Sequence, residues 1–333
     1  MTTADTTPDP VPGPPPGPAA DLGLPELHRS VTDWFDAAAR DLPWRDPHCS
    51  PWGVMVSEFM LQQTPVVRVL PVWRVWLQRW PRPADLAAES TGEAVRAWGR
   101  LGYPRRALRL HAAAVEITER HGGRVPAGHD ELLALPGVGA YTAAAIAVFA
   151  FGDRQVVVDT NIRRVQARVV SGRALPSRSL TAAEARLAEE LMPEDDALAV
   201  RWNKAVMELG ALVCTARSPR CEQCPVRHAC AWVAAGRPEP AEAPRGQSWH
   251  GTDRQVRGAI MAVLRAGHDP VPGPHLTGPV DVATGTGLGP EALRALDALH
   301  GLRAPEDQRR RALDGLLQDG LAVRGPAGIS LPG

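Results

Sequence analysis

Lysine is almost absent from this 333-residue chain, which has one lysine, Lys204, among its 37 lysines and arginines. Any imine formed by a side-chain amine would therefore have to use Lys204. Tyrosine is nearly as scarce, with only Tyr103 and Tyr141. No apolar run approaches the roughly 18 residues that a membrane-spanning helix needs. The sequence therefore predicts no membrane span and leaves very few positions for amine chemistry.

The net charge is zero, which by itself gives no indication of a nucleic-acid partner. The charges are unevenly distributed along the chain, however. Residues 100–170 contain ten arginines against six acidic residues, whereas residues 184–196 contain six acidic residues and one arginine. A protein that is neutral as a whole can in this way present a basic face to a polyanion.

Four of the five cysteines lie within seventeen residues, in the pattern Cys214-x6-Cys221-x2-Cys224-x5-Cys230. Two prolines interrupt this stretch, so it predicts a metal-binding loop and not a hydrophobic core. At the level of the residues, zinc and an iron–sulfur cluster both stay open, although four-cysteine zinc sites usually have two close Cys-x2-Cys pairs and this loop has one. Disulfides are not expected, because the sequence shows no hydrophobic leader and we expect a cytoplasmic context. Cys49 lies outside the pattern and is predicted to be a reduced thiol.

The composition divides the chain into four predicted segments. Residues 1–24 are proline-rich and are expected to be disordered. Residues 25–235 contain one helical pattern after another with short loops and no convincing alternating strands, which predicts a mainly α domain. Residues 236–250 are expected to form a linker. Residues 251–333 predict a small α+β domain of three helices and a terminal hairpin, similar to a winged helix.

A glycine-rich turn and one carboxylate are the most informative features of the mainly α region. The turn is Leu135-Pro136-Gly137-Val138-Gly139, and Asp159 follows Gly139 by twenty residues. Because glycines have no Cβ, the backbone N–H groups of such a turn can face a phosphate at a helix N-terminus. The alanine-rich stretch Tyr141–Phe151 after the turn predicts a buried helix. An ordinary helical hairpin is the alternative explanation of this turn.

Several motifs together resemble one known family. They are Trp44-Arg45, Ser57-Glu58-Phe59-Met60-Leu61-Gln62-Gln63-Thr64, Leu101-Gly102-Tyr103, LPGVGAYTA at 135–143, DTNIRRV at 159–165 and MELGALVC at 207–214. With the 6-2-5 cysteine spacing, they resemble the MutY adenine glycosylases of the helix-hairpin-helix base-excision superfamily, in an actinobacterial form. The resemblance covers about residues 25–235. It implies a two-lobed helix-hairpin-helix fold with a [4Fe-4S] cluster held by the cysteine loop at 214–230.

The resemblance implies that two carboxyl groups divide the chemistry. Glu58 would protonate N7 of an adenine flipped out of the duplex. Asp159 would stabilise the oxocarbenium ion of the sugar or form a transient adduct, and Asn161 would orient Asp159 or the attacking water. Tyr141 occupies the position where bifunctional relatives have a lysine, so strand cleavage through an imine is not expected. Glu58 lies among apolar residues, and burial disfavours the charged form of a carboxyl, which suits an acid.

The resemblance also implies a set of DNA contacts. Gln63 and Tyr103 would enter the space left by the flipped base and touch the opposite base. Leu42, Trp44 and Arg45 would form the wall of the adenine pocket, although helix packing also explains the first two. The full set is Leu42, Trp44, Arg45, Gln63, Thr64, Leu101, Tyr103, Gly137, Val138 and Gly139.

The implied function is monofunctional removal of adenine opposite 8-oxoguanine or guanine in double-stranded DNA. We expect a monomer in a bacterial cytoplasm, associated with the nucleoid. Two alternatives stay open: a thymine or uracil mismatch glycosylase of the same superfamily, and a non-catalytic iron–sulfur DNA-binding protein.

The sequence departs from the family pattern in three places. Pro104 replaces the second tyrosine of the usual Leu-Gly-Tyr-Tyr, and Lys204 lies where a Gln or Glu is expected near the adenine. The residues beyond the linker are too few for the usual MutT-like domain that recognises 8-oxoguanine. They contain an arginine set, which suggests that this reduced domain clamps the duplex opposite the excised base: Arg254, Arg257, Arg265, Arg309, Arg310 and Arg311.

Overall fold

The computed structural model describes residues 23–240, 249–278 and 287–333. Contacts divide the chain into two compact units, each made of two segments. We call residues 1–42 and 147–243 the cysteine unit, and residues 43–146 and 244–333 the hairpin unit. Nearly all of the proline-rich tail and most of the expected linker lie outside the described residues. The described chain is mainly helical, as predicted, and none of its helices is long and apolar enough to cross a membrane.

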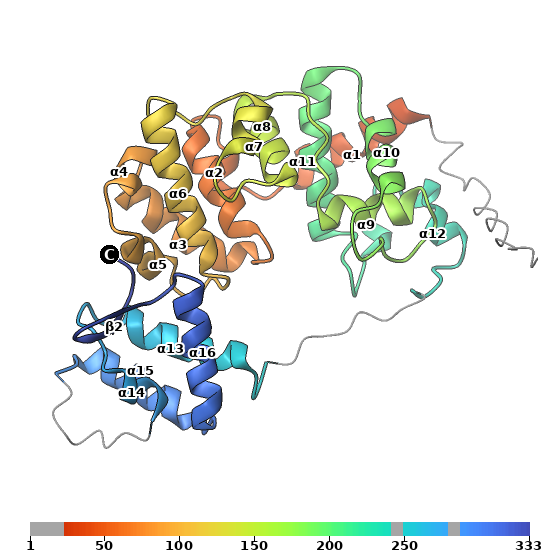
Figure 1. Ribbon diagram of the computed structural model, residues 1–333. Helices are drawn as coiled ribbons and strands as arrows, with labels where there is room; N and C mark the ends of the chain where they lie inside the picture. The colour runs from red at the N-terminus through yellow and green to blue at the C-terminus, as the bar shows by residue number, and fades with distance from the viewer. Residues whose placement is uncertain (1–22, 241–248, 279–286) are drawn as a thin grey trace, which may run out of the picture. The chain divides into compact units, whose positions relative to one another are not determined.

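The first segment of the hairpin unit is a bundle of helices labelled in Figure 1. Its elements are the 3-10 turn η2 (Pro43–Arg45) and the helices α2 (Pro51–Leu61), α3 (Val66–Arg79), α4 (Pro83–Ala87), α5 (Thr91–Trp98), α6 (Arg105–Arg120), α7 (His129–Ala134) and α8 (Ala140–Phe151), the last of which crosses into the cysteine unit. Apart from the short α4, these helices follow the sequence pattern to within a few residues. Ser50 caps α2 by accepting a hydrogen bond from the Gly53 N–H, which fixes where α2 begins.

Helix α2 is apolar on every side and is buried over nearly its whole length. Trp52 of α2 and Trp73 of α3 each donate the indole N–H to a backbone carbonyl. The Trp52 indole donates to the Trp80 carbonyl at 3.0 Å, and the Trp73 indole donates to the Gly53 carbonyl at 2.8 Å. Because α2 is buried and closely packed, a side chain on it is held in one position.

The second segment of the hairpin unit contains the three predicted helices and the terminal hairpin, with one additional short helix. The elements are α13 (Asp253–Arg265), α14 (Gly273–Thr277), α15 (Pro290–Gly301), α16 (Glu306–Gln318), β1 (Val323–Gly325) and β2 (Gly328–Ser330). The two strands pair antiparallel, and Val271 adds a bridge to Ile329. Apolar side chains of α13, α15 and α16 form a separate small core.

The cysteine unit is built around a packed pair of helices, α9 and α11 (Figure 1). Its elements are α1 (Leu24–Ala38), α9 (Thr160–Val169), α10 (Ala182–Glu190), α11 (Asp196–Leu212), the turns η3 (Cys221–Gln223) and η4 (Arg227–Ala229), and α12 (Ala231–Ala234). Glu208 of α11 is fully buried and accepts hydrogen bonds from Nε and Nη2 of Arg40 at 2.7 and 2.6 Å. This two-pronged ion pair attaches the end of the N-terminal helical segment to α11.

Candidate functional site

Glu58 lies in the buried helix α2 of the hairpin unit, with 5% of its surface exposed. The hydroxyl of Tyr141, at the start of α8, donates a hydrogen bond to Oε2 of Glu58 at 3.0 Å. The two helices are joined again one turn away, where the Gln62 amide donates to Oγ1 of Thr142 at 3.3 Å. The structure therefore brings together two predicted site residues that are 83 positions apart in the sequence. Their hydrogen bond fixes the orientation of the Glu58 carboxyl group.

Gln63 and Tyr103 are exposed at two turns of the hairpin unit. Both have left-handed backbone conformations, with φ of 56° and 47°, which are uncommon for residues other than glycine. Oγ1 of the buried Thr64 donates to the carbonyl of the buried Leu101 at 3.3 Å, so these two residues join the turns and do not form the surface. Strained backbone conformations that buried contacts hold in place are typical of functional sites. At these two turns the exposed side chains are those of Gln63 and Tyr103.

The two glycines of the hairpin turn differ in their backbone conformation and surroundings. Gly137 has a φ of +78°, and a Cβ placed on it would come within 2.5 Å of the Arg109 Cβ. Gly139 has an ordinary backbone conformation, and a Cβ placed there would meet no protein atom within 4 Å. Val138 between them is buried. Internal packing explains Gly137, whereas the space in front of Gly139 is open to a ligand.

This difference gives a first prediction. We expect Gly139→Ala to leave the melting temperature nearly unchanged but to weaken duplex binding by about tenfold, because a hydrogen bond to a charged group contributes roughly 1.5–3 kcal/mol. We expect Gly137→Ala to lower the melting temperature, because of its backbone strain and the contact with Arg109. Melting curves and duplex binding at one fixed salt concentration check both variants. Unchanged duplex binding by Gly139→Ala would show that the turn does not contact DNA.

The three residues assigned to the wall of the adenine pocket lie where the chain passes from one unit to the other. Leu42 is the last residue of its segment of the cysteine unit, and Trp44 and Arg45 belong to η2 of the hairpin unit. Trp44 is buried and packs edge-to-face on Trp73, with ring centroids 5.6 Å apart. Packing within the hairpin unit thus explains the presence of a tryptophan at position 44, which is the alternative explanation given for it from the sequence.

Asp159 and Asn161 lie in the cysteine unit, at the N-terminus of α9. Asp159 is the N-cap of this helix, and its Oδ1 accepts a hydrogen bond from the Ile162 N–H at 2.6 Å. Its other oxygen, Oδ2, accepts from the Asn161 amide at 2.8 Å. Burial raises the pKa of Asp159 above its usual value, although these hydrogen bonds and the charge of Arg164 oppose the rise. The helix terminus, the amide and the guanidinium all favour the ionised carboxylate at this position.

Two residues, Arg164 and Gly210, support the position of Asn161, and neither was predicted as a site residue from the sequence. Arg164 donates from Nη2 to Oδ1 of Asn161 at 2.7 Å, to the Gly210 carbonyl at 2.7 Å, and from Nε to the Cys214 carbonyl at 2.7 Å. A Cβ placed on Gly210 would lie 2.7 Å from the Asn161 Cβ, so only glycine allows α11 this close to α9. The DTNIRRV and MELGALVC motifs therefore meet in space and connect Asp159 to the cysteine loop.

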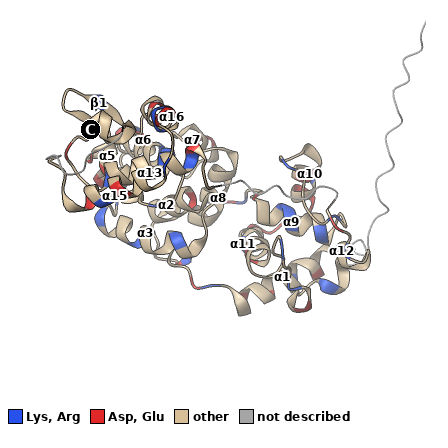
Figure 2. Ribbon diagram, turned by 90° about the horizontal axis from the view of Figure 1, so that it is seen from below, with Lys and Arg blue, Asp and Glu red and all other residues tan. Residues whose placement is uncertain are grey.

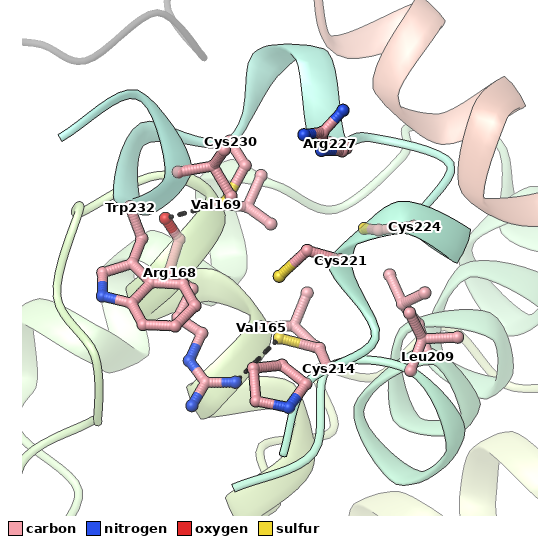
Figure 3. A pocket seen from close by; sticks show the side chains of 13 residues that line it. Val165, Arg168, Val169, Leu209, Cys214, Cys221, Cys224, Arg227, Cys230 and Trp232 are labelled. Atoms are coloured by element: carbon pink, nitrogen blue, oxygen red, sulfur yellow. Dashed lines mark hydrogen bonds between the residues drawn. The ribbon is translucent and has the colours of Figure 1, made fainter. Parts of the chain in front are cut away.

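The four cysteines line one cavity in the cysteine unit (Figure 3). Burial, with a smaller contribution from the neighbouring cysteines, raises the pKa of Cys224 to about 12, and burial also raises the pKa of Cys230. Such thiols stay protonated at neutral pH unless a cation displaces the proton. Within the described residues, no three His, Cys, Asp or Glu side chains lie close enough together to ligate one metal ion. The wider spacing around a cavity fits a multi-atom cluster better than a single zinc ion.

Arg168 of α9 borders this cavity, as Figure 3 shows. It donates from Nη1 to Sγ of Cys214 at 3.4 Å and to the Thr215 carbonyl at 2.7 Å, and its guanidinium lies 4.5 Å from the Trp232 ring centroid. Arg163 of the same helix is also buried and pairs with Glu184 at 2.6 Å. The arginines of α9, the helix after Asp159, therefore bind partners inside the cysteine unit. The number of arginines in this stretch of sequence suggested a more basic surface than the helix has.

The arginine set of the C-terminal segment is used partly inside the protein and partly in ion pairs at its surface. Arg265 and Arg309 are largely buried and donate to the carbonyls of Val95 and Thr277 at 3.0 Å each. The remaining partners are acidic: Arg257 pairs with Asp319, Arg310 with Glu306 and Arg311 with Asp307. Figure 2 shows the mixed charge of α16. Of the six, only Arg254 has aromatic rings as its described partners.

Comparisons with known proteins match both sites. Residues 56–190 match the family model described as HhH-GPD superfamily base excision DNA repair protein, and residues 214–230 match the iron-sulfur binding domain of endonuclease III. The first match includes Glu58, Tyr141 and Asp159, and the second begins and ends at the outer cysteines. A [4Fe-4S] cluster is therefore the cofactor of this chain, as the sequence predicted.

Individual relatives agree with the family models. The chain is 47% identical to an adenine DNA glycosylase of Mycobacterium tuberculosis over 303 residues, which is 90% of this chain and 91% of that protein. It is 43% identical over 210 residues to the human adenine DNA glycosylase, covering 60% of this chain and 38% of that protein. Among solved structures, a thermostable thymine-DNA glycosylase is similar with a TM-score of 0.57 and 27% identity, covering 65% of this chain and 99% of that one.

Proposed function

The chain belongs to the adenine DNA glycosylase family, and on that basis we propose that it excises adenine opposite 8-oxoguanine or guanine by hydrolysing the N-glycosidic bond, without cleaving the strand. The observation that supports this most directly is the hydrogen bond from Tyr141 to the buried Glu58. It provides an oriented carboxyl group in a buried site, with a tyrosine where an imine-forming lysine would be needed for strand cleavage.

Glu58 is proposed to be the general acid of this reaction. Adenine is a poor leaving group as an anion, and a proton placed on its N7 allows it to depart as the neutral base. The adenine must first leave the base stack, which costs roughly a few kcal/mol. Tyr141 then holds Oε2 of Glu58, so that the other oxygen of the carboxyl group is directed to the base. The exposed Gln63 and Tyr103 are proposed to fill the space that the adenine vacates.

Asp159 is proposed to be the second carboxyl group. Departure of the base leaves an oxocarbenium ion on the sugar, and a fixed carboxylate stabilises that cation electrostatically or bonds to it transiently. The amide of Asn161 holds one carboxylate oxygen and the helix N-terminus holds the other, so the ionised form is already oriented before the cation forms. The same amide is positioned to orient the attacking water.

Cys214, Cys221, Cys224 and Cys230 are proposed to ligate the [4Fe-4S] cluster. The cluster is assigned no step of the hydrolysis, and when bound it supplies the cross-link that fixes the loop between Cys214 and Cys230. That loop exposes Arg217, Arg220 and Arg227, which we propose to contact phosphates. Its first cysteine is joined through Arg164 to Asn161, so the cross-link also supports the position of Asp159.

The pKa of Asp159 gives a prediction with a defined sign. Asp159 acts as the anion, so the excision rate falls as pH falls through its pKa, which burial has raised above the usual value of about 3.9. The Asn161 amide favours the anion and thereby lowers this pKa. We therefore expect Asn161→Ala to move the acidic limb of the single-turnover pH profile to higher pH, beyond any loss of maximum rate. A limb that stays in place or moves to lower pH would contradict the assignment of Asp159.

A panel of duplexes separates this proposal from a thymine or uracil mismatch glycosylase. Adenine is placed opposite 8-oxoguanine, guanine or cytosine, and thymine or uracil opposite guanine, and the released base is measured under single-turnover conditions. We expect excision of adenine opposite 8-oxoguanine and guanine and little or no excision of thymine or uracil. Preferential removal of thymine would favour the alternative, and no release from any duplex would favour a non-catalytic iron–sulfur DNA-binding protein. We further propose a cytoplasmic, nucleoid-associated monomer, which sedimentation and DNA pull-down can test.

A further inference from the structure

One cluster of exposed aromatic and cationic side chains in the hairpin unit contains two residues, Trp249 and Arg254, that the proposed reaction does not use. It consists of Tyr103, Trp249 and Arg254, and the two rings are exposed to 46% and 45%. The Arg254 guanidinium carbon lies 5.5 Å from the Tyr103 ring centroid and 5.4 Å from the Trp249 ring centroid. The second guanidinium at Tyr103, that of Arg106, is buried and 4.5 Å from the ring centroid. We call Tyr103, Trp249 and Arg254 the aromatic cluster.

The aromatic cluster joins two segments that are far apart in the sequence. Arg254 lies in the first turn of α13, and Trp249 lies just before that helix, with its Cη2 atom 3.7 Å from where a Gly258 Cβ would be. The Trp249 carbonyl accepts a hydrogen bond from Oγ1 of Thr252, the N-cap of α13, at 2.8 Å. The indole is thus held along α13 by its local fold, and α13 presents it together with Arg254.

Polar contacts with α5 and α6, the helices on either side of Tyr103, hold α13 in place. Arg96 of α5 donates from Nη1 to the Gly267 carbonyl at 2.7 Å, and Arg265 of α13 donates from Nε to the Val95 carbonyl at 3.0 Å. Arg105 of α6 pairs with Asp319 at 3.3 Å, and Asp319 also pairs with Arg257 of α13. Arg257 and Arg265 thus take part in fixing α13, and Arg254 of the same helix lies exposed beside Tyr103.

We propose that Trp249 and Arg254 extend Tyr103 into a binding surface for the base opposite the excised adenine, and that they determine the preference for 8-oxoguanine over guanine. This inference depends on the proposed function. Exposed aromatic rings stack on bases, and a guanidinium can stack and donate hydrogen bonds at the same time. 8-Oxoguanine differs from guanine in having a carbonyl oxygen at C8, which is an acceptor for a guanidinium.

The test measures discrimination between two opposite bases. Full-length protein with its cluster is assayed against duplexes in which the uncleavable 2′-fluoro-2′-deoxyadenosine lies opposite 8-oxoguanine or guanine, at one salt concentration. We expect Arg254→Ala and Trp249→Ala each to reduce the preference for 8-oxoguanine by about tenfold, since base–aromatic stacking and hydrogen-bonded base recognition contribute roughly 1–3 kcal/mol each. Arg294→Ala, which removes an exposed arginine on α15 of the same segment, should leave the preference unchanged. Arg254 and Trp249 are surface residues, so iron content and melting temperature should match the wild type.

Two further variants separate stacking from simple charge. Arg254→Lys keeps the positive charge but lacks the planar fork, so we expect it to behave like Arg254→Ala. The effects of Tyr103→Ala and Arg254→Ala should be less than additive, because both remove parts of one stack. An unchanged preference in both alanine variants, or full restoration by Arg254→Lys, would overturn the inference while leaving adenine excision in place. Failure of the wild-type protein to release adenine from any duplex would instead overturn the proposed function.

Discussion

Replacing either proposed catalytic carboxyl group should abolish excision while leaving DNA binding in place. Glu58→Gln keeps the size and the hydrogen bond with Tyr141 but cannot supply the proton, and Asp159→Asn cannot stabilise a cation as an anion does. We expect single-turnover excision of adenine opposite 8-oxoguanine to fall by at least about a thousandfold in each variant, since acid–base and electrostatic contributions are typically 10²–10⁴-fold. Duplex affinity should stay within a few-fold, because phosphate contacts provide most of it.

The cysteine unit offers a matched control for Asp159. Asp195 is also an N-cap, accepting a hydrogen bond from the Leu198 N–H at 2.8 Å, but it caps α11 and has no role in the proposed chemistry. Asp195→Asn should therefore show the effect of altering a helix cap without a loss of excision. For Glu58, the control variant is Asp130→Asn, which replaces a fully exposed carboxylate of α7 by an amide. Near-normal turnover by Glu58→Gln or Asp159→Asn would refute the assignment of that residue.

The second large effect is expected from removing one cysteine of the loop. Cys224→Ala should lower the iron content from on the order of four per chain to well below one, with loss of the broad visible absorption of the cluster. The cavity would then lose its cross-link, so we expect a lower melting temperature and weaker, less salt-dependent duplex binding as Arg217, Arg220 and Arg227 lose their fixed positions.

Cys49 provides the control for this experiment. It precedes α2 in the hairpin unit and is not part of the cysteine loop, and burial raises the pKa of its thiol, as expected for an unreactive cysteine. Cys49→Ala should keep full iron content and affinity. Stoichiometric zinc in the purified wild-type protein, or full iron content in Cys224→Ala, would show that the ligand assignment is wrong.

The sequence was sufficient to predict the helices whose pattern is local. Helix α2 and the alanine-rich α8 were predicted because both are apolar on all sides, and the Gly137–Gly139 turn could be placed between helices from its glycines. Glu58 and Asp159 could be proposed from motifs because the residue types fit the chemistry. Their hydrogen bonds to Tyr141 and Asn161 agree with those proposals, and their catalytic roles stay predictions.

The sequence could not reveal which arginines have internal partners. Counting charges suggested a basic face within residues 100–170, but Arg164 and Arg168 bind carbonyl groups and a thiol in the interior. Such pairing depends on contacts between residues about fifty positions apart, and composition contains no information on it. The contact that forbids a side chain at Gly210 is hidden for the same reason, although the glycine itself in the middle of a helix was a usable signal.

The most direct test of the central claim is to identify both products of one reaction on a duplex with adenine opposite 8-oxoguanine. The reaction is run with and without borohydride, and the base and the strand are analysed separately. We expect free adenine, a strand that stays intact until it is treated with alkali, and little or no borohydride-trapped protein, because Tyr141 cannot form an imine and the only lysine is Lys204. Absence of free adenine, or efficient trapping with strand cleavage, would contradict the assignment of this chain as a monofunctional adenine glycosylase.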